Sequence, residues 1–363
     1  MIAPKRALIA AGGTGGHMFP ARAAAQELVA RGWQVRLVTD ARGMKHTDGF
    51  PAEIIDQIRA ASPVTKNPIK LVGAWIELLS GLLACRKIIK TWKPDIVAGF
   101  GGYPAFPALM AARQKHLPIA IHEQNAVLGR VNRVFAKAAG FIASGFERLD
   151  RAPNKAKRLI TGNPVRSEFV VAREKSFPND GGTLRIFVLG GSLGARILSE
   201  TVPAAIADLP ERLKSRLEVA QQTREESLAM AQDLYQQAGV TAECAPFFAD
   251  VAERLASAHL VIARAGASSV SEIACVGRPA IFVPLKIAAD DHQTANAEGL
   301  VDAGAADSIP EHEFNAEALT ALLEVRLSNH AELKERAAKS ALLGRPDAGS
   351  LFADALIALE QGN

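Results

Sequence analysis

The chain has 363 residues, of which 48% are hydrophobic, and its formal net charge is +4. This length and composition predict a globular protein with two domains. The three cysteines form no CxxC pair, and the longest weakly charged stretch, 71–85, is shorter than the roughly 20 residues that span a bilayer. With no room for a signal peptide before the first apolar run, these features exclude a secreted or membrane-spanning protein and predict a cytoplasmic one.

The charge is divided unevenly along the chain. Residues 1–163 contain 24 Lys and Arg against 10 Asp and Glu, a balance of +14, whereas residues 164–363 contain 18 against 28, a balance of −10. A basic first half indicates a polyanionic partner, either nucleic acid or an anionic membrane surface. Chance variation in surface charge is the alternative.

The first predicted element is a short buried strand at 7–10, which runs into the sequence AAGGTGGH at 10–17. Four glycines in the five positions 12–16 allow close backbone approach, and the helical composition of 20–30 places the loop at a helix N-terminus. This pattern predicts an anion-binding loop rather than a simple tight turn.

Two familiar glycine-rich fingerprints fit this loop poorly. A P-loop requires Gly-Lys-Ser/Thr, but His17 follows Gly16; a dinucleotide fingerprint requires a glycine at Met18. Asp40 nevertheless ends the next strand about where a ribose-binding acid is expected. A nicotinamide-dependent dehydrogenase therefore remains an alternative.

Apolar runs that alternate with helical stretches predict two doubly wound, Rossmann-like α/β domains in tandem. We expect domains at 1–163 and 164–346, divided near the turn at 161–164, and a C-terminal helix at 347–363 that can pack back on the first domain. Ligands of such sheets bind at the carboxyl ends of strands, so the predicted site lies in the cleft between the domains. The expected strands are 7–10, 35–38, 95–98, 119–122 and 141–143, then 185–189, 217–220, 258–263 and 279–283.

The segment 66–93 has an apolar stripe at Leu71, Trp75, Leu78 and Leu82, with a second stripe beside it and lysines or arginines at both ends. An apolar face edged with cations is typical of a helix that lies on anionic lipid. Core packing explains one stripe equally well, and both interpretations stay open.

Polar residues follow another first-half strand, in the run His122-Glu123-Gln124-Asn125. Because His17 also lies at a strand end, these residues are expected to converge on one site. A polar loop after a buried strand is the alternative.

In the second half, Ser268 and Ser269 begin a helix after a strand, which leaves N–H groups for a phosphate. Glu272 lies about one turn further on, where a carboxylate can accept both hydroxyls of a ribose, and Gln293 is placed to contact a sugar. Together they indicate a nucleotide sugar, although Glu272 can equally be a helix-start carboxylate. Asp290, Asp291 and His292 are consecutive and predict no metal site.

Several motifs, in order along essentially the whole chain, resemble the bacterial MurG family of glycosyltransferases. They are GGTGGH at 12–17, GGY at 101–103, HEQN at 122–125, GNPVR at 162–166, GGSxGAR at 190–196 and VSE at 270–272.

The resemblance implies a GT-B enzyme that transfers N-acetylglucosamine from UDP-N-acetylglucosamine, with inversion, to the 4-hydroxyl of undecaprenyl-pyrophosphoryl-MurNAc-pentapeptide (lipid I). The product would be lipid II, the peptidoglycan precursor. The resemblance also implies a peripheral protein on the cytoplasmic face of the inner membrane. Residues 71–83 would then contact an anionic membrane surface, and nucleic acid would not be a partner. Carried over by motif, the donor-binding residues are Thr14, Gly15, Gly16, Asn125, Arg166, Ser192, Glu272 and Gln293.

This chemistry needs neither a metal nor a cofactor if cationic and N–H groups stabilise the leaving diphosphate. Arg166, the Ser192 loop and the helix start at Ser268 and Ser269 can do so. The acceptor proton needs a base, for which we expect His17, with Glu123 as the rival. A UDP-N-acetylglucosamine 2-epimerase or another GT-B nucleotide-sugar enzyme and a non-enzymatic nucleotide-binding scaffold remain alternatives, which membrane association and turnover would discriminate.

Overall fold

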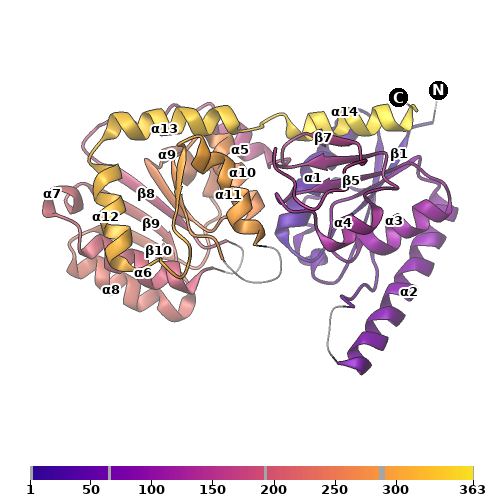
Figure 1. Cartoon of the computed structure of the whole chain (residues 1–363), viewed down its shortest axis with the longest axis horizontal. Coiled ribbons are helices and arrows are strands. Elements are labelled where there is room, and N and C mark those ends of the chain that lie inside the picture. Colours follow the sequence, from indigo (N-terminus) through magenta and orange to yellow (C-terminus); the bar gives the residue numbers. More distant parts are fainter. Residues whose placement is uncertain (1–2, 64–66, 192–193, 286–290, 363) are drawn as a thin grey trace. The chain divides into compact units, whose positions relative to one another are not determined.

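A computed structural model describes residues 3–63, 67–191, 194–285 and 291–362 of the chain, which divides into two units (Figure 1). Unit 1 comprises Met1–Arg166 and Arg345–Asn363, and unit 2 comprises Ser167–Gly344. The chain therefore crosses between the units after Arg166 and after Gly344, a few residues from the positions expected from sequence. The cleft expected between two domains stays a prediction.

Unit 1 is built on a parallel sheet whose seven strands follow the order β3-β2-β1-β4-β5-β6-β7. Side chains of β1 alternate between the two faces: Ala7 and Ile9 pack with α1, and Leu8 and Ala10 pack with α2 and α3. The sheet is thus covered on both sides, as a doubly wound fold requires. The strands are β1 (Arg6–Ala10), β2 (Gln34–Thr39), β3 (Ile54–Gln57), β4 (Ile96–Gly99), β5 (Ile119–Glu123), β6 (Phe141–Ser144) and β7 (Arg158–Ile160); the helices are α1 (Gly15–Ala30), η1 (Gly43–His46), α2 (Pro68–Trp92), α3 (Ala105–Gln114), α4 (Arg130–Phe135) and α14 (Ala348–Glu360).

The last helix, α14, belongs to unit 1 although it follows all of unit 2 in sequence. It lies beside α1 (Figure 1). Phe352 and Leu356 are fully buried against the same sheet face as α1, and Lys5 Nζ lies 2.7 Å from Glu360 Oε1. These contacts hold both ends of the chain on one unit.

Unit 2 repeats the plan with a six-stranded parallel sheet in the order β10-β9-β8-β11-β12-β13. Its strands are β8 (Leu184–Leu189), β9 (Leu217–Gln222), β10 (Thr241–Ala245), β11 (Leu260–Ala263), β12 (Ala280–Phe282) and β13 (Ala306–Ser308). Its helices are α5 (Ser167–Ala172), α6 (Arg196–Ala207), α7 (Glu211–Lys214), η2 (Glu225–Ser227), α8 (Leu228–Gln237), α9 (Val251–Ser257), α10 (Ala267–Val276), α11 (His292–Asp302), α12 (Ala316–Leu327) and α13 (His330–Leu343). In both sheets the strand order reverses beside the first strand, at β1 and β4 and at β8 and β11, which is where ligands of such folds bind.

Four strands were not expected from the sequence: β3, β7, β10 and β13. They are the outermost strands of the two sheets. None carries a continuous buried run of the kind that identified the inner strands; β3, for instance, has no buried residue.

Helix α2 has two different faces. Its carboxyl-terminal half packs Cys85, Ile88 and Ile89 into the core with α3. Gly81 allows the backbone of Arg59 to lie close to the helix, because a Cβ at Gly81 would lie 2.5 Å from the carbonyl oxygen of Arg59. Between Ile69 and Leu83, a second set of apolar side chains is exposed. These are Ile69, Val72, Trp75, Ile76, Leu79 and Leu83, each more than half exposed.

Candidate functional site

The glycine loop of unit 1 is held by the buried carboxylate of Asp40, which follows β2. Asp40 Oδ1 accepts hydrogen bonds from the backbone N–H of Gly13 at 2.9 Å and of Gly43 at 2.8 Å. Gly13 adopts a φ of +88°, which glycine accepts without strain. Asp40 therefore shapes the loop from within, instead of presenting its carboxylate to a ribose as the dehydrogenase alternative requires.

The loop packs directly on the glycines that follow β4. A Cβ on Gly102 would lie 2.6 Å from the carbonyl oxygen of Gly12, and a Cβ on Gly101 would lie 3.2 Å from the ring of His17. Both glycines have positive φ. The pair at 101–102 thus makes room for the first glycine loop and for the His17 ring, at the point where the sheet order reverses.

His17 is connected to the end of β5 by a chain of hydrogen bonds. Its Nδ1 lies 3.0 Å from Gln124 Oε1, Gln124 Nε2 lies 3.1 Å from His122 Nδ1, and His122 Nε2 lies 3.1 Å from the carbonyl oxygen of Gly162. His17 is half-buried, whereas His122 and Gln124 are buried. Burial lowers the pKa of His122 to about 4, so this ring is neutral near pH 7.

Glu123 lies at the end of β5 and organises the loop that follows. Its Oε1 accepts from the backbone and side-chain nitrogens of Asn125, and its Oε2 accepts at 2.8 Å from both the Gly129 N–H and Asn132 Nδ2. The carboxylate is 2% exposed. With donors on both oxygens, Glu123 is suited to positioning Asn125; the choice of base between His17 and Glu123 stays a prediction.

The start of α1 carries the residues predicted to bind an anion, and that role stays a prediction. Thr14 is the N-cap, its side chain makes no capping bond, and the first turn contains no acidic residue. The Arg166 guanidinium lies 4.9 Å from the ring centroid of Phe19, which itself packs on Gly15. The Arg166 guanidinium therefore lies on a ring that packs against the start of α1, where the N–H groups of Gly15 and Gly16 are.

The glycine loop of unit 2 follows β8 and is held by Gln222, from the end of β9. Gln222 Oε1 accepts from the Gly190 N–H at 3.0 Å, and its Nε2 donates to the carbonyl oxygen of Gly191 at 3.1 Å. Gly191 and Gly194 both have positive φ. Ser192, predicted here, lies outside the described residues.

Ser268, Ser269 and Glu272 are all carried by α10, which begins after β11. Ser268 Oγ is buried and has no hydrogen-bond partner among the residues that the structure describes, and the first turn contains no acidic residue. The preceding turn is braced by Arg264, which bonds the carbonyl oxygen of Val283, and by Asn296, which bonds that of Ala265. The result is a fixed helix N-terminus that can receive a phosphate.

Gln293 lies in the first turn of α11, and its Oε1 accepts from the Leu285 N–H at 2.9 Å. We expected this side chain both to donate and to accept toward a sugar. Because its oxygen is engaged within the protein, a sugar contact would be made by Nε2 as donor.

The structure gives no support for a metal site in its described part. Among those residues, no group of three His, Cys, Asp or Glu side chains is arranged to hold a metal ion. Asp291 is exposed and accepts a bond from Thr294 Oγ1, and Asp290 lies outside the described residues.

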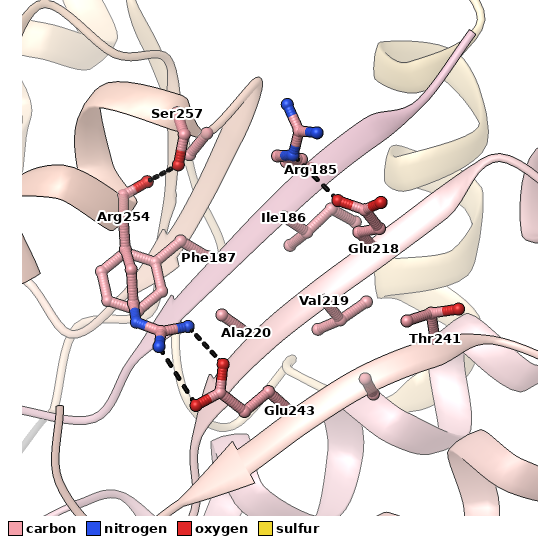
Figure 2. A pocket seen from close by; sticks show the side chains of 12 residues that line it. Arg185, Ile186, Phe187, Glu218, Val219, Ala220, Thr241, Glu243, Arg254 and Ser257 are labelled. Atoms are coloured by element: carbon pink, nitrogen blue, oxygen red, sulfur yellow. Dashed lines mark hydrogen bonds and ion pairs between the residues drawn. The ribbon is translucent and has the colours of Figure 1, made fainter. Parts of the chain in front are cut away.

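A cavity of about 320 Å³ in unit 2 lies away from these loops, against the first halves of β8, β9 and β10. Figure 2 shows that its charged side chains face one another. Arg254 forms two hydrogen bonds with Glu243, and Arg185 bonds Glu218 at 2.9 Å. Since these charges neutralise each other, we assign the cavity no part in the site.

The fold, with a glycine loop after the first strand of each sheet, defines a two-domain α/β protein of GT-B architecture. The model of the glycosyltransferase family 28 N-terminal domain matches residues 7–144, and that of the C-terminal domain matches residues 185–352. The protein is therefore a glycosyltransferase.

Comparison with individual proteins narrows this class. The chain is 62% identical to the UDP-N-acetylglucosamine--N-acetylmuramyl-(pentapeptide) pyrophosphoryl-undecaprenol N-acetylglucosamine transferase of Maricaulis maris, over 99% of both chains. It is 33% identical to the crystal structure of Acinetobacter baumannii MurG, with a TM-score of 0.80 over 98% of this chain and 100% of that one. The chain belongs to the MurG family.

A second solved structure is the UDP-GlcNAc 2-epimerase of Neisseria meningitidis bound to UDP-GlcNAc. The match covers 97% of this chain and 100% of that one, with a TM-score of 0.71. Its sequence identity of 13% shows a shared fold and nothing more.

The structure also reveals contributors that the sequence motifs did not single out. Gln222, at the end of β9, bonds the glycine loop of unit 2, and Asn132, on α4, bonds Glu123. The ring of Phe19 contacts the Arg166 guanidinium. Gln222 was detectable in principle, since it is a polar residue at the end of a predicted strand. For Asn132 and Phe19, only the tertiary contacts identify the role.

Proposed function

We propose that this enzyme transfers N-acetylglucosamine from UDP-N-acetylglucosamine to the 4-hydroxyl of lipid I and so forms lipid II. The observation that carries the proposal is the 62% identity to a named transferase along the whole chain. The site residues support it, because a base, a cation and two helix N-termini are the groups that a sugar transfer with loss of UDP requires.

Each unit is proposed to contribute its own groups. In unit 2, Glu272 accepts the ribose hydroxyls, Gln293 donates to the sugar, and the N-terminus of α10 with the Ser192 loop stabilises the diphosphate as it leaves. In unit 1, the N-terminus of α1 and Arg166 are suited to the same negative charge. Thr14, Gly15, Gly16 and Asn125 complete the contacts. His17 removes the proton of the acceptor hydroxyl as that oxygen attacks the anomeric carbon, and a single displacement of this kind inverts the anomeric centre.

The epimerase alternative shares the fold and predicts different chemistry. An epimerase alters UDP-N-acetylglucosamine without a second substrate, whereas the transferase releases UDP only as the lipid-linked acceptor is glycosylated. The decisive measurement is UDP release and disaccharide formation with and without lipid I. Conversion of the UDP-sugar without acceptor would reject the proposal.

We expect Glu272→Ala to raise the donor KM at least tenfold. The variant loses a charged acceptor of hydrogen bonds worth about 1.5–3 kcal/mol, and this contact is made to bound donor. Steady-state kinetics over a range of UDP-N-acetylglucosamine concentrations measures the effect. Glu253→Ala, an exposed site on α9, is the matched control; an unchanged donor KM in Glu272→Ala removes this residue from the site.

Turnover should survive chelation. Arginine and backbone N–H groups supply the charge stabilisation in the proposed site, so we expect the rate in excess EDTA to equal the untreated rate. The test is UDP release before and after dialysis against chelator. Loss of activity that Mg²⁺ or Mn²⁺ restores would contradict it.

We also propose that the first half of α2 places the enzyme on an anionic membrane surface. By length and composition alone, helix α2 is long and apolar enough to cross a bilayer. Its carboxyl-terminal half is anchored in the core, however, which suits a helix lying on the surface. The exposed apolar side chains from Ile69 to Leu83 adjoin exposed Lys70, Arg86 and Lys87, the arrangement of an interfacial helix.

Binding to anionic vesicles should weaken with salt without vanishing. Each cation near the surface contributes about 1 kcal/mol that salt screens, whereas apolar insertion resists salt. The double variant Trp75→Ser/Leu79→Ser should lose the salt-resistant part in a vesicle co-sedimentation assay and keep its turnover of a short-chain, water-soluble acceptor.

The matched control is Phe247→Ser/Leu342→Ser, which removes two exposed apolar side chains of unit 2. Unfolding of the Trp75→Ser/Leu79→Ser variant, or equal loss of binding in the control, would show that α2 is not the membrane contact.

A further inference from the structure

We propose that Gln124 and His122 are positioning residues that fix the His17 ring with its proton on Nδ1, which leaves Nε2 as the proton acceptor. The proposal deepens the function given above and depends on it. Neither residue needs to touch substrate, because both act through the hydrogen bonds that connect His17 to the end of β5.

The direction of the chain follows from its last member. The carbonyl oxygen of Gly162 can only accept, so His122 Nε2, 3.1 Å away, must carry a proton and donate it. A neutral imidazole has one N–H, so His122 Nδ1 is then an acceptor. The group facing it must be a donor.

Gln124 passes this constraint on to His17. Its Nε2 donates to His122 Nδ1 at 3.1 Å, which turns Oε1 toward His17. An amide oxygen can only accept, so His17 Nδ1, 3.0 Å away, is the protonated nitrogen. The neutral His17 ring therefore holds its lone pair on Nε2.

Local packing keeps the amide from reversing. The His122 ring stacks on Phe100 with centroids 5.3 Å apart, and the backbone carbonyl of Gln124 accepts from Asn163 Nδ2 at 2.9 Å. Gly101, at a φ of +84°, leaves space for the His17 ring and Gln124. Burial also keeps His122 neutral, since its lowered pKa of about 4 prevents the second N–H that would disrupt the pattern.

The consequence for the transfer step is specific. As the acceptor oxygen forms its bond to the anomeric carbon, its proton passes to His17 Nε2, and the bond from that carbon to the diphosphate oxygen breaks with its electron pair on UDP. His17 becomes an imidazolium whose Nδ1–H still bonds Gln124 Oε1. A neutral amide stabilises this cation by its dipole. A carboxylate partner would instead favour protonation of the ring before the acceptor arrives.

The first test reads the tautomer directly. In protein carrying ¹⁵N-histidine, His17 ring signals are assigned by their absence in His17→Ala and recorded where titration shows the ring to be neutral. We expect a protonated Nδ1 and an unprotonated Nε2. A proton on Nε2 of His17 would overturn the proposal whatever the enzyme's turnover, so this result is independent of the proposed function.

The second test changes Gln124. Gln124→Met removes both polar atoms, and we expect kcat to fall about 10–100-fold with donor KM nearly unchanged, because only the orientation of the base is lost. The His17 spectrum should become a tautomer mixture. Gln114→Met, an exposed site on α3, is the matched control. A kcat within about threefold of wild type refutes the positioning role.

Gln124→Glu provides a rescue that does not depend on how well Gln124→Met folds. As a carboxylate it still accepts from His17 Nδ1, and as a protonated acid it also donates to His122 as the amide does. At a pH where the His17 ring is neutral, we expect the ring to keep its proton on Nδ1 and kcat to exceed that of Gln124→Met. Loss of the Nδ1 proton in this variant contradicts the proposal, whereas absence of lipid II formation by wild-type enzyme would instead reject the proposed function.

Discussion

Replacing His17 with alanine should lower kcat for glycosyl transfer by about 10²–10⁴-fold, the range by which general-base catalysis accelerates a reaction. The alanine variant has no group to take the acceptor proton. The donor KM should change little, because the donor-binding residues are unaltered. Steady-state UDP release with lipid I measures both constants.

His312→Ala, which removes an exposed histidine of unit 2, is the matched control and should retain full activity. The rival base is tested by Glu123→Gln. This variant should fail mainly through its loop, since Glu123 accepts four hydrogen bonds from loop residues and from Asn132. If His17→Ala kept its activity and a well-folded Glu123→Gln lost it, Glu123 would be the base.

Arg278→Met should lower the free energy of unfolding by about 3–5 kcal/mol. Arg278 is 2% exposed and donates to the carbonyl oxygens of Leu255 and Ala256 at the end of α9, of Val276 and Gly277 at the end of α10, and of Lys175 and Ser176 before β8. Helix-end carbonyls have no partner within their own helix. Methionine fills much of the volume but removes the side-chain donor from these buried acceptors, of which the Leu255 carbonyl oxygen also accepts from the Ala258 N–H at 3.1 Å.

Chemical denaturation of both proteins gives the difference in unfolding free energy. Arg212→Met is the matched control; its guanidinium pairs with Glu324 at the surface, where such pairs contribute about 0–1 kcal/mol. Burial lowers the pKa of Arg278 to about 10, so the guanidinium is still charged near neutral pH and remains a strong donor. If Arg278→Met lowered the free energy of unfolding no more than the control does, the carbonyl oxygens would have found other hydrogen-bond donors.

The candidate site was only partly predictable. The motif HEQN was expected to present polar groups to a ligand, yet His122, Glu123 and Gln124 are buried. His122 and Gln124 bond each other, and Glu123 bonds Asn125, the Gly129 N–H and Asn132. A sequence shows that a strand ends in polar residues; it does not show which of them turn inward. That choice depends on acceptors from distant segments, such as the carbonyl oxygen of Gly162.

The faces of α2 were decided in the same way. Periodicity identified two adjacent apolar stripes and left core and membrane interpretations equal. In the structure Leu78 is buried, whereas Val72, Ile76 and Leu79 are exposed, because α3 covers only one side of the helix. A hydrophobic side chain carries no information about which neighbour will cover it.

By itself, the sequence determined the inner strands of both sheets and the glycine loops at their ends. Inner strands are buried on both faces and appear as continuous apolar runs, and a loop that approaches a ligand or another backbone needs glycine. Tertiary structure decided the edge strands, the unit on which α14 packs and the tautomer of His17. Each of these depends on pairing with residues far away in the chain: β3 is half-exposed and pairs only with β2, and α14 lies beside α1 after an intervening unit. The local pattern of apolar residues indicates which segments are buried, whereas contacts between distant segments determine which strand or helix each one packs against.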